Sequence, residues 1–392
     1  MVVATPEIFT SLDAAFSERN AAFEDFFSRE APRLAKASQE MAQRFLRGGR
    51  LLAFGRGACS TDAQHVSVEF IHPVIVGKRA LPALDLSAAF GPWVEALVRP
   101  EDIVIGFGPP GGDPEVTSAL RTAESRGAMT LALPGARGSY AFEAPALHPF
   151  VHQELTEILY HTLWETVHVF LEHQGLGHDA GSAGFLYPFL ENQTGTHHLL
   201  PEVAGSILAK SRDDAKLRAA VARSQRDALQ SAVDAMRRSL SLGGKLILFG
   251  NGGSATDAND WALDCVLPPP GYRAIPAVSL SLEPASITAL ANDVGTEVIF
   301  LRQLIAHARP HDIAVAFSTS GGSRNIIAAL EEARRRNLLT VALLGYDGGE
   351  IARRGLADHA LIVACDYIPR IQEVQASMYH VIRDLLERPA HA

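Results

Sequence analysis

The chain has 392 residues, 47% of them apolar and 20% charged, a composition typical of a globular protein too long for one average domain. Its formal net charge is −9, and no stretch gathers lysine and arginine into a basic face, so we do not expect it to bind nucleic acid. The three cysteines lie far apart, which argues against a disulfide framework or a thiolate zinc site and favours a cytoplasmic protein. Because no signal peptide and no run of about 18 apolar residues is present, neither export by that route nor membrane insertion is expected.

The second half of the chain repeats the first. The repeat opens with GGRLLAFG at residues 48–55 and GGKLILFG at residues 243–250. Three further blocks follow in the same order, pairing 79–87 with 273–281, 101–135 with 311–345, and 152–161 with 371–380. Matching blocks in one order predict an internal duplication. We therefore expect a first domain over residues 1–172, a connection over 173–200 and a second domain over 201–392.

Each copy alternates short apolar runs with helical segments. The runs are rich in Val, Ile and Leu and end at Gly or polar turns: LLAFG (51–55), DIVIGFG (102–108), AMTLALPG (128–135), KLILFG (245–250), DIAVAFS (312–318), LLTVALLG (338–345) and HALIVAC (359–365). Such runs are typical of strands buried on both faces of a parallel sheet. Residues 118–127 and 325–337 have helical spacing, and the EEARRR run at 331–336 is interpreted as a solvated helix face. The sequence predicts an α/β fold with two doubly wound parallel sheets flanked by helices.

Two turns of the second copy follow predicted strands and precede predicted helices. In the first turn, glycines let the backbone approach a ligand and place amide groups at a helix N-terminus, although a plain tight turn is the alternative: Asn251, Gly252, Gly253 and Ser254. The second turn carries four hydroxyl side chains: Ser318, Thr319, Ser320 and Ser323. A helix cap needs only one such residue, so four hydroxyls beside helix-terminal amides favour phosphate binding.

These turns carry a family resemblance. GNGGS (250–254), AND (291–293), STSGGS (318–323) and RIQE (370–373) followed by His380 resemble the sugar isomerase (SIS) domain, and more narrowly the phosphoheptose isomerase family. The resemblance covers residues 201–387 and extends to the first copy through the repeat. It implies that sedoheptulose 7-phosphate is converted to a heptose 7-phosphate. It assigns substrate binding to the eight turn residues above and to Asn292, Asp293, Gln372 and His380.

The resemblance also implies a zinc site, with a His and a Glu four residues apart and a Gln and a His eight residues apart on the last helix. The first copy fills all four positions, with His65, Glu69, Gln153 and His161. In the second copy the first pair is replaced by Asp260 and Asp264, beside Gln372 and His380. Two carboxylates make a poorer zinc site than His and Glu, although they suit a harder ion. We therefore expect Zn²⁺ in the first copy; a surface ion pair is the alternative for an isolated HxxxE pair.

The first copy has lost the phosphate turn. Gly108, Pro109, Pro110 and Asp113 replace the four hydroxyl residues, and Asp113 would repel a phosphate. Arg56 stands in place of Asn251. One copy thus keeps the metal ligands and the other keeps the phosphate turn. This complementary loss leads us to expect a composite active site, within a chain or across a homodimer of tandem chains with four domains.

The motifs together predict an aldose–ketose isomerase acting on a sugar phosphate. Such a reaction needs a base to move a proton between C1 and C2 and an acid to protonate oxygen. By resemblance, Glu69 is the base and His161 the acid. The alternative is a non-enzymatic SIS module that senses a sugar phosphate or binds protein partners, because SIS domains serve both purposes.

Overall fold

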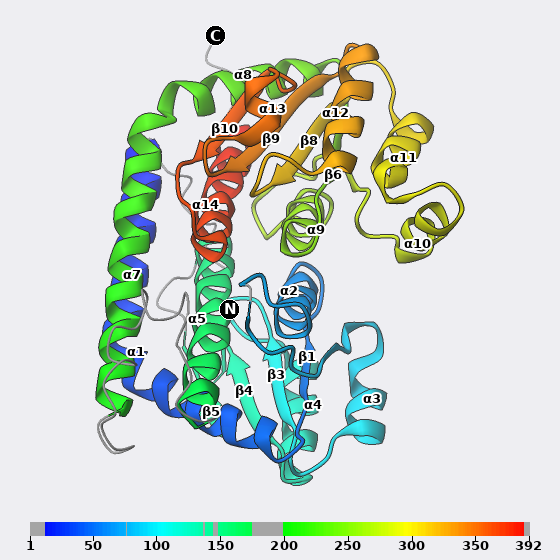
Figure 1. The fold of residues 1–392 in the computed structure, drawn as a ribbon. Helices are drawn as coiled ribbons and strands as arrows, with labels where there is room; N and C mark the ends of the chain where they lie inside the picture. Colours follow the sequence, from blue (N-terminus) through cyan, green and yellow to red (C-terminus); the bar gives the residue numbers. More distant parts are fainter. Residues whose placement is uncertain (1–11, 76, 136–137, 144–147, 175–198, 388–392) are drawn as a thin grey trace. The chain divides into compact units, whose positions relative to one another are not determined.

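The computed structural model describes residues 12–75, 77–135, 138–143, 148–174 and 199–387 (Figure 1). The chain divides into two compact units: residues 19–215 form the first unit, and residues 1–18 with 216–392 form the second. The division falls within helix α1 (Leu12–Leu46) and within helix α7 (Leu199–Ser224). The sequence-based boundaries at 172 and 201 stay a prediction, and residues 175–198 of the expected connection lie outside the described residues.

The first unit contains a five-stranded parallel sheet in the order β2-β1-β3-β4-β5. Its strands are β1 (Leu51–Phe54), β2 (Ala83–Asp85), β3 (Ile103–Phe107), β4 (Met129–Leu133) and β5 (Tyr140–Ala141). Besides α1 and α7, its helices are α2 (Cys59–Ile71), α3 (Phe90–Leu97), α4 (Pro114–Ser125) and α5 (Pro149–Gln174), with a short 3₁₀ turn at Ser87–Ala89.

The second unit contains a five-stranded parallel sheet in the equivalent order β7-β6-β8-β9-β10. Its strands are β6 (Leu246–Phe249), β7 (Ala277–Ser279), β8 (Ile313–Ser318), β9 (Leu339–Gly345) and β10 (His359–Val363). Its helices are α8 (Arg226–Ser241), α9 (Gly253–Val266), α10 (Pro284–Asp293), α11 (Ile299–His307), α12 (Arg324–Arg335), α13 (Gly349–Arg353) and α14 (Ile368–Glu387), with a 3₁₀ turn at Thr296–Val298. The predicted fold class is confirmed in both units.

Apolar side chains at helical spacing attach the helices to each sheet. Helix α4 packs against β3 and β4 and buries Val116, Ala119, Leu120 and Ala123. Helix α12 packs in the same way against β8 and β9 and buries Ile326, Ala329, Leu330 and Ala333. This 3–4–7 spacing places four side chains on one face of a helix. The charged run 331–336 is mostly solvated, but Glu332 is buried because it lies on the core side, where it pairs with Arg336.

The strand order brings particular turns together within each unit. In a parallel sheet the carboxyl ends of all strands meet at one edge, and ligands bind where neighbouring connections leave in opposite directions. Strand β1 pairs with both β2 and β3, and β6 pairs with both β7 and β8. The turns after β6 and β8 are the two motif turns of the second copy.

No helix in the described part of the chain is long and apolar enough to cross a membrane.

Candidate functional site

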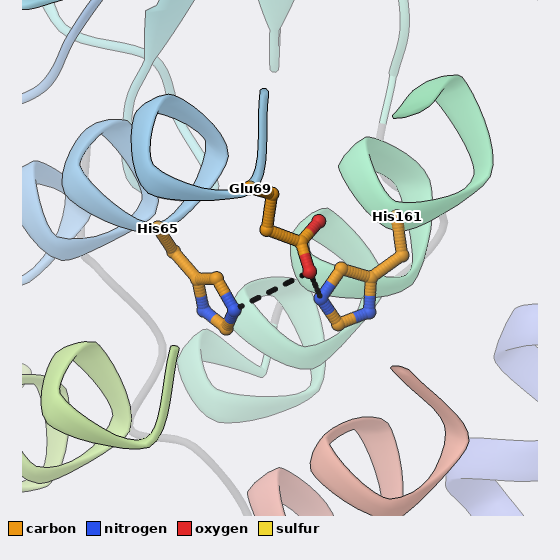
Figure 2. Close-up of side chains that lie close together, drawn as sticks. All are labelled: His65, Glu69 and His161. Carbon is orange, nitrogen blue, oxygen red and sulfur yellow. Dashed lines mark ion pairs between the residues drawn. The ribbon is translucent and has the colours of Figure 1, made fainter. Parts of the chain in front are cut away.

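Three side chains of the first unit converge between helices α2 and α5 (Figure 2). His65 and Glu69 stand one turn apart on α2, and His161 comes from α5. Glu69 Oε1 lies 3.2 Å from His161 Nε2 and 3.9 Å from His65 Nε2. Because residues four apart share a helix face, both α2 side chains reach the same partner on α5. We name His65, Glu69 and His161 the first-unit cluster.

Burial sets the charge state of His65. The exposed fractions of His65, Glu69 and His161 are 2%, 3% and 0%. Burial lowers the pKa of His65 to about 3; the Glu69 charge opposes this shift and His161 adds to it. His65 is therefore neutral at pH 7 and carries a ring lone pair that can bind a metal ion.

The buried carboxylate of Glu69 would be stabilised by a bound cation. Among the described residues, neither of its oxygens accepts a hydrogen bond, and the ionisable side chains in contact with it are the two imidazoles. A buried carboxylate without donors is costly, and a bound cation would offset that cost. One ligand atom from each cluster residue lies within 4.8 Å of the others. This set of two nitrogens and one carboxylate oxygen fits a divalent ion such as Zn²⁺.

Gln153 is the fourth residue that the resemblance assigns to the metal. It lies on α5 eight residues before His161, and its side chain is buried. Two helical turns separate residues eight apart, about 12 Å along the axis. The participation of the long Gln153 amide in the first-unit cluster stays a prediction.

The second unit holds an equivalent group, the second-unit cluster, made of Asp260, Asp264 and His380. His380 Nε2 lies 3.1 Å from Asp264 Oδ2 and 3.5 Å from Asp260 Oδ2. The Tyr379 hydroxyl donates to Asp260 Oδ2 over 2.8 Å. Burial first, and then the charge of Asp260, raise the pKa of Asp264 to about 7. Unlike Glu69, these carboxylates already face hydrogen-bond donors within the protein.

This difference predicts about one zinc ion per chain, bound at the first-unit cluster. His65→Ala removes a nitrogen ligand and leaves Glu69 uncompensated, so its zinc content is expected to fall. Asp260→Ala, at the equivalent position of the second unit, is the matched control and is expected to retain zinc. Elemental analysis of the purified proteins measures the number of zinc ions per chain. Equal zinc loss in both variants, or no loss in His65→Ala, would contradict the assignment.

The hydroxyl-rich turn of the second unit lies between β8 and α12. Ser318 Oγ accepts a hydrogen bond from the Gly321 amide over 3.1 Å, and Ser320 Oγ accepts one from the Gly322 amide over 3.3 Å. Two of the four hydroxyls therefore help to shape the turn, and their O–H groups donate to no other described residue. Ser323 is the N-cap of α12, and its side chain makes no capping bond. The arrangement leaves hydroxyl donors at a helix N-terminus, where an anion is favoured.

The two motif turns of the second unit are joined by a residue that the motif analysis missed. Asn325, the second residue of α12, exchanges side-chain hydrogen bonds with Asn251. The sequence signal was an amide residue two positions after the hydroxyl turn, which a search for hydroxyls and glycines overlooks. Gly252 makes the first turn possible because its φ of +57° lies in the region that favours glycine.

Four further predicted substrate residues are also placed. Asn292 and Asp293 end helix α10, are exposed, and bond to each other over 2.8 Å. Within the described chain, no hydrogen bond joins this pair to either motif turn. On α14, Gln372 is buried and His380 belongs to the second-unit cluster. The role of all four in substrate binding stays a prediction.

The equivalent turn of the first unit is organised by charge. Asp113 caps α4 by accepting from the amides of Glu115 and Val116. Arg56 Nη1 donates to Glu115 Oε1 over 2.8 Å and lies 3.5 Å from Asp113 Oδ2. With its arginine paired to two carboxylates, this turn offers a phosphate no free cation among its described side chains.

A buried histidine beside this turn is expected to make the first unit sensitive to acid. His152 Nε2 donates to the Gly108 carbonyl over 2.9 Å, and burial lowers the pKa of His152 to about 4 in spite of this bond. In the unfolded chain the His152 imidazole binds a proton near pH 6.5, whereas in the folded protein it does so only near pH 4. The free energy of unfolding is therefore highest above pH 6.5, and it falls by about 3 kcal/mol for this group as the pH drops toward 4.

We expect His152→Ile to reduce the acid sensitivity of the first unit, because isoleucine binds no proton. Isoleucine is the chosen replacement because the repeat places Ile371 at the equivalent position. Urea unfolding of both proteins between pH 7 and pH 4.5, with hydrogen exchange of α5 as the local probe, measures it. A variant with the same pH dependence as the unchanged protein would contradict the prediction.

Comparisons with known proteins place this fold in a class. A family model described as "SIS domain" matches residues 212–345. The C-terminal domain of glucosamine-fructose-6-phosphate aminotransferase from Francisella tularensis aligns with 97% of this chain and 96% of its own, with a TM-score of 0.61 at 9% identity. Tagatose-6-phosphate ketose/aldose isomerase from Escherichia coli aligns with 98% of this chain and 94% of its own, with a TM-score of 0.58 at 14% identity. The chain therefore has the fold of two tandem SIS domains.

Relatives found by sequence narrow the class of SIS-fold proteins to one family. The phosphoheptose isomerase of Citrifermentans bemidjiense is 43% identical over 166 residues, which are 41% of this chain and 83% of that protein. The phosphoheptose isomerase of Helicobacter pylori is 38% identical over 169 residues, 42% of this chain and 85% of that protein. The chain belongs to the phosphoheptose isomerase family.

Proposed function

We propose that this protein interconverts an aldose and a ketose phosphate, with sedoheptulose 7-phosphate and a heptose 7-phosphate as the first candidate pair. The observation that carries the proposal is the buried first-unit cluster, in which an acidic side chain meets two imidazoles. Family membership and the hydroxyl-rich turn of the second unit support the sugar-phosphate part of the proposal.

The chemistry requires a proton to move between C1 and C2 through an enediol. We assign the base to Glu69 and the acid to His161, whose Nε2 lies 3.2 Å from Glu69 Oε1. Neither oxygen of Glu69 accepts a hydrogen bond from the described residues, so the carboxylate is open to a proton of a bound substrate. Zn²⁺, held by His65, Glu69 and His161 with Gln153 as the fourth candidate, would supply a Lewis acid for the substrate carbonyl when bound.

The phosphate is assigned to the second unit. Backbone amides at the start of α12 and the hydroxyls of Ser318, Thr319, Ser320 and Ser323 are suited to a dianion, because hydroxyl and amide donors form strong bonds to charged oxygens. The first unit offers Pro109 and Pro110 at the equivalent places, which supply neither hydroxyls nor backbone donors. A homodimer of tandem chains is part of the same proposal.

The second candidate function is a non-enzymatic sugar-phosphate sensor, and one experiment separates the two. The full chain is incubated with a panel of ketose phosphates from five to seven carbons, and aldose formation is followed by NMR. Turnover of any member supports an isomerase, and the preferred chain length identifies the substrate class. Binding measured by calorimetry without turnover at any zinc concentration would favour the sensor. If no member of the panel is bound or turned over, both candidate functions are overturned.

A further inference from the structure

Two asparagines form a reciprocal amide pair at the carboxyl edge of the second sheet. Asn251 Nδ2 donates to Asn325 Oδ1 over 3.0 Å, and Asn325 Nδ2 donates to Asn251 Oδ1 over 2.9 Å. Asn251 belongs to the turn after β6, and Asn325 lies in the first turn of α12, just beyond β8. Because β6 and β8 are paired neighbours, the amide pair ties the glycine turn to the hydroxyl turn.

A backbone hydrogen bond fixes the orientation of the Asn325 side-chain amide. The Ile326 amide donates to Asn325 Oδ1 over 2.9 Å, so that oxygen must face the backbone donor and the Asn251 amino group. Asn325 is buried, whereas Asn251 is exposed. The buried partner therefore orients the exposed one.

This orientation leaves Asn251 with unused hydrogen-bonding capacity. A side-chain amide has two N–H donors and a carbonyl with two lone pairs. Within the described chain, Asn251 uses one donor and one acceptor position, both on Asn325. One N–H and one lone pair remain for a ligand, held in a fixed direction at the edge of the sheet.

The first unit supplies a natural comparison. At the equivalent positions, Arg56 and Glu115 join the same two turns through an ion pair of 2.8 Å. The link between the turns is thus present in both units, but it is neutral in the second and charged in the first. A carboxylate at position 325 would stand beside the phosphate turn and repel a dianion, whereas an amide does not.

We propose that Asn325 is a positioning residue, which holds the Asn251 amide in the orientation that binds a phosphorylated sugar and keeps the link between the two turns neutral. The inference rests on the proposed function, because it assigns the sugar phosphate to the turns of the second unit. Asn325 acts through Asn251, so the effect of removing Asn325 depends on the presence of Asn251.

A double-mutant cycle measures that dependence. Sedoheptulose 7-phosphate binding is titrated calorimetrically against the full chain, Asn325→Ala, Asn251→Ala and the double variant. Asn325→Ala alone is expected to weaken binding about five- to tenfold, as for the loss of a net hydrogen bond. In the Asn251→Ala background the same change is expected to cost less than about twofold. If the sugar phosphate turns over, KM is expected to rise with kcat nearly unchanged, since these residues hold the substrate.

Two isosteric variants complete the test. Asn325→Asp keeps the acceptor for Ile326 but loses the donor to Asn251 and adds a negative charge, so it is expected to bind more weakly than Asn325→Ala, with the difference shrinking at high salt. Glu115→Gln makes the reverse change, from carboxylate to amide, at the equivalent position of the first unit and is expected to leave binding unchanged. Thermal unfolding of the full chain and of each variant is compared, so that a variant that has lost its fold is recognised.

The outcomes separate the two proposals. If the unchanged chain binds the sugar phosphate and the cost of Asn325→Ala is the same in both backgrounds, the positioning role is overturned and the proposed function stands. If the unchanged chain binds no sugar phosphate, the proposed function fails and the positioning role fails with it. Equal effects of Glu115→Gln and Asn325→Asp would also overturn the assignment to the second unit.

Discussion

Glu69→Gln is expected to lower kcat by a factor of about 10² to 10⁴, the usual contribution of a positioned general base. Glutamine has nearly the same shape as glutamate but is not a base at neutral pH. The buried site removes water as a substitute, since Glu69 is only 3% exposed. Steady-state kinetics with the sugar phosphate identified by NMR measures the loss, and zinc content is determined on the same sample so that metal loss is recognised.

Asp264→Asn is the matched control for Glu69→Gln. The repeat places Asp264 at the position of Glu69, and its carboxylate already interacts with His380. We expect its kcat to stay within about threefold of the unchanged protein, well below the effect of losing a general base. If Asp264→Asn abolishes turnover and Glu69→Gln does not, catalysis belongs to the second-unit cluster.

Ser320→Ala is expected to weaken sugar-phosphate binding at least tenfold. A hydrogen bond to a charged group contributes about 1.5 to 3 kcal/mol, and the Ser320 hydroxyl has an O–H that donates to no other described residue. Calorimetric titration with the sugar phosphate and with inorganic phosphate gives the loss. A comparable loss with both ligands assigns Ser320 to the phosphate rather than to the sugar.

Pro110→Ala controls for general effects of changing such a turn. Pro110 stands at the position of Ser320 in the first unit and has no hydroxyl to lose. Its substitution is expected to change binding less than twofold, a difference well below one net hydrogen bond. Equal losses in Ser320→Ala and Pro110→Ala would mean that the phosphate is not held by the hydroxyl turn of the second unit.

Much of the fold followed from local pattern and repetition. The apolar runs at 51–55 and 245–250 predicted buried parallel strands because both faces of each strand are covered, which removes the alternation of exposed strands. Strands β2 and β7 were not predicted, since each has only three residues and no hydrophobic period can be read over so short a stretch. Strand β5, with two residues, was missed for the same reason.

The sequence by itself determined the duplication, the fold class, the family and the residue types available in each copy. Spacing along a helix brings His65 and Glu69 onto one face, so that pairing was readable without coordinates. The approach of His161 to Glu69 depends on how α5 packs against α2, and the link between Asn251 and Asn325 depends on the pairing of β6 with β8. Tertiary structure also decided that Glu69 has no hydrogen-bond donor among the described residues while the carboxylates of the second-unit cluster have one. Burial and partners are properties of packing between segments distant in sequence, and those properties set charge state and hydrogen bonding.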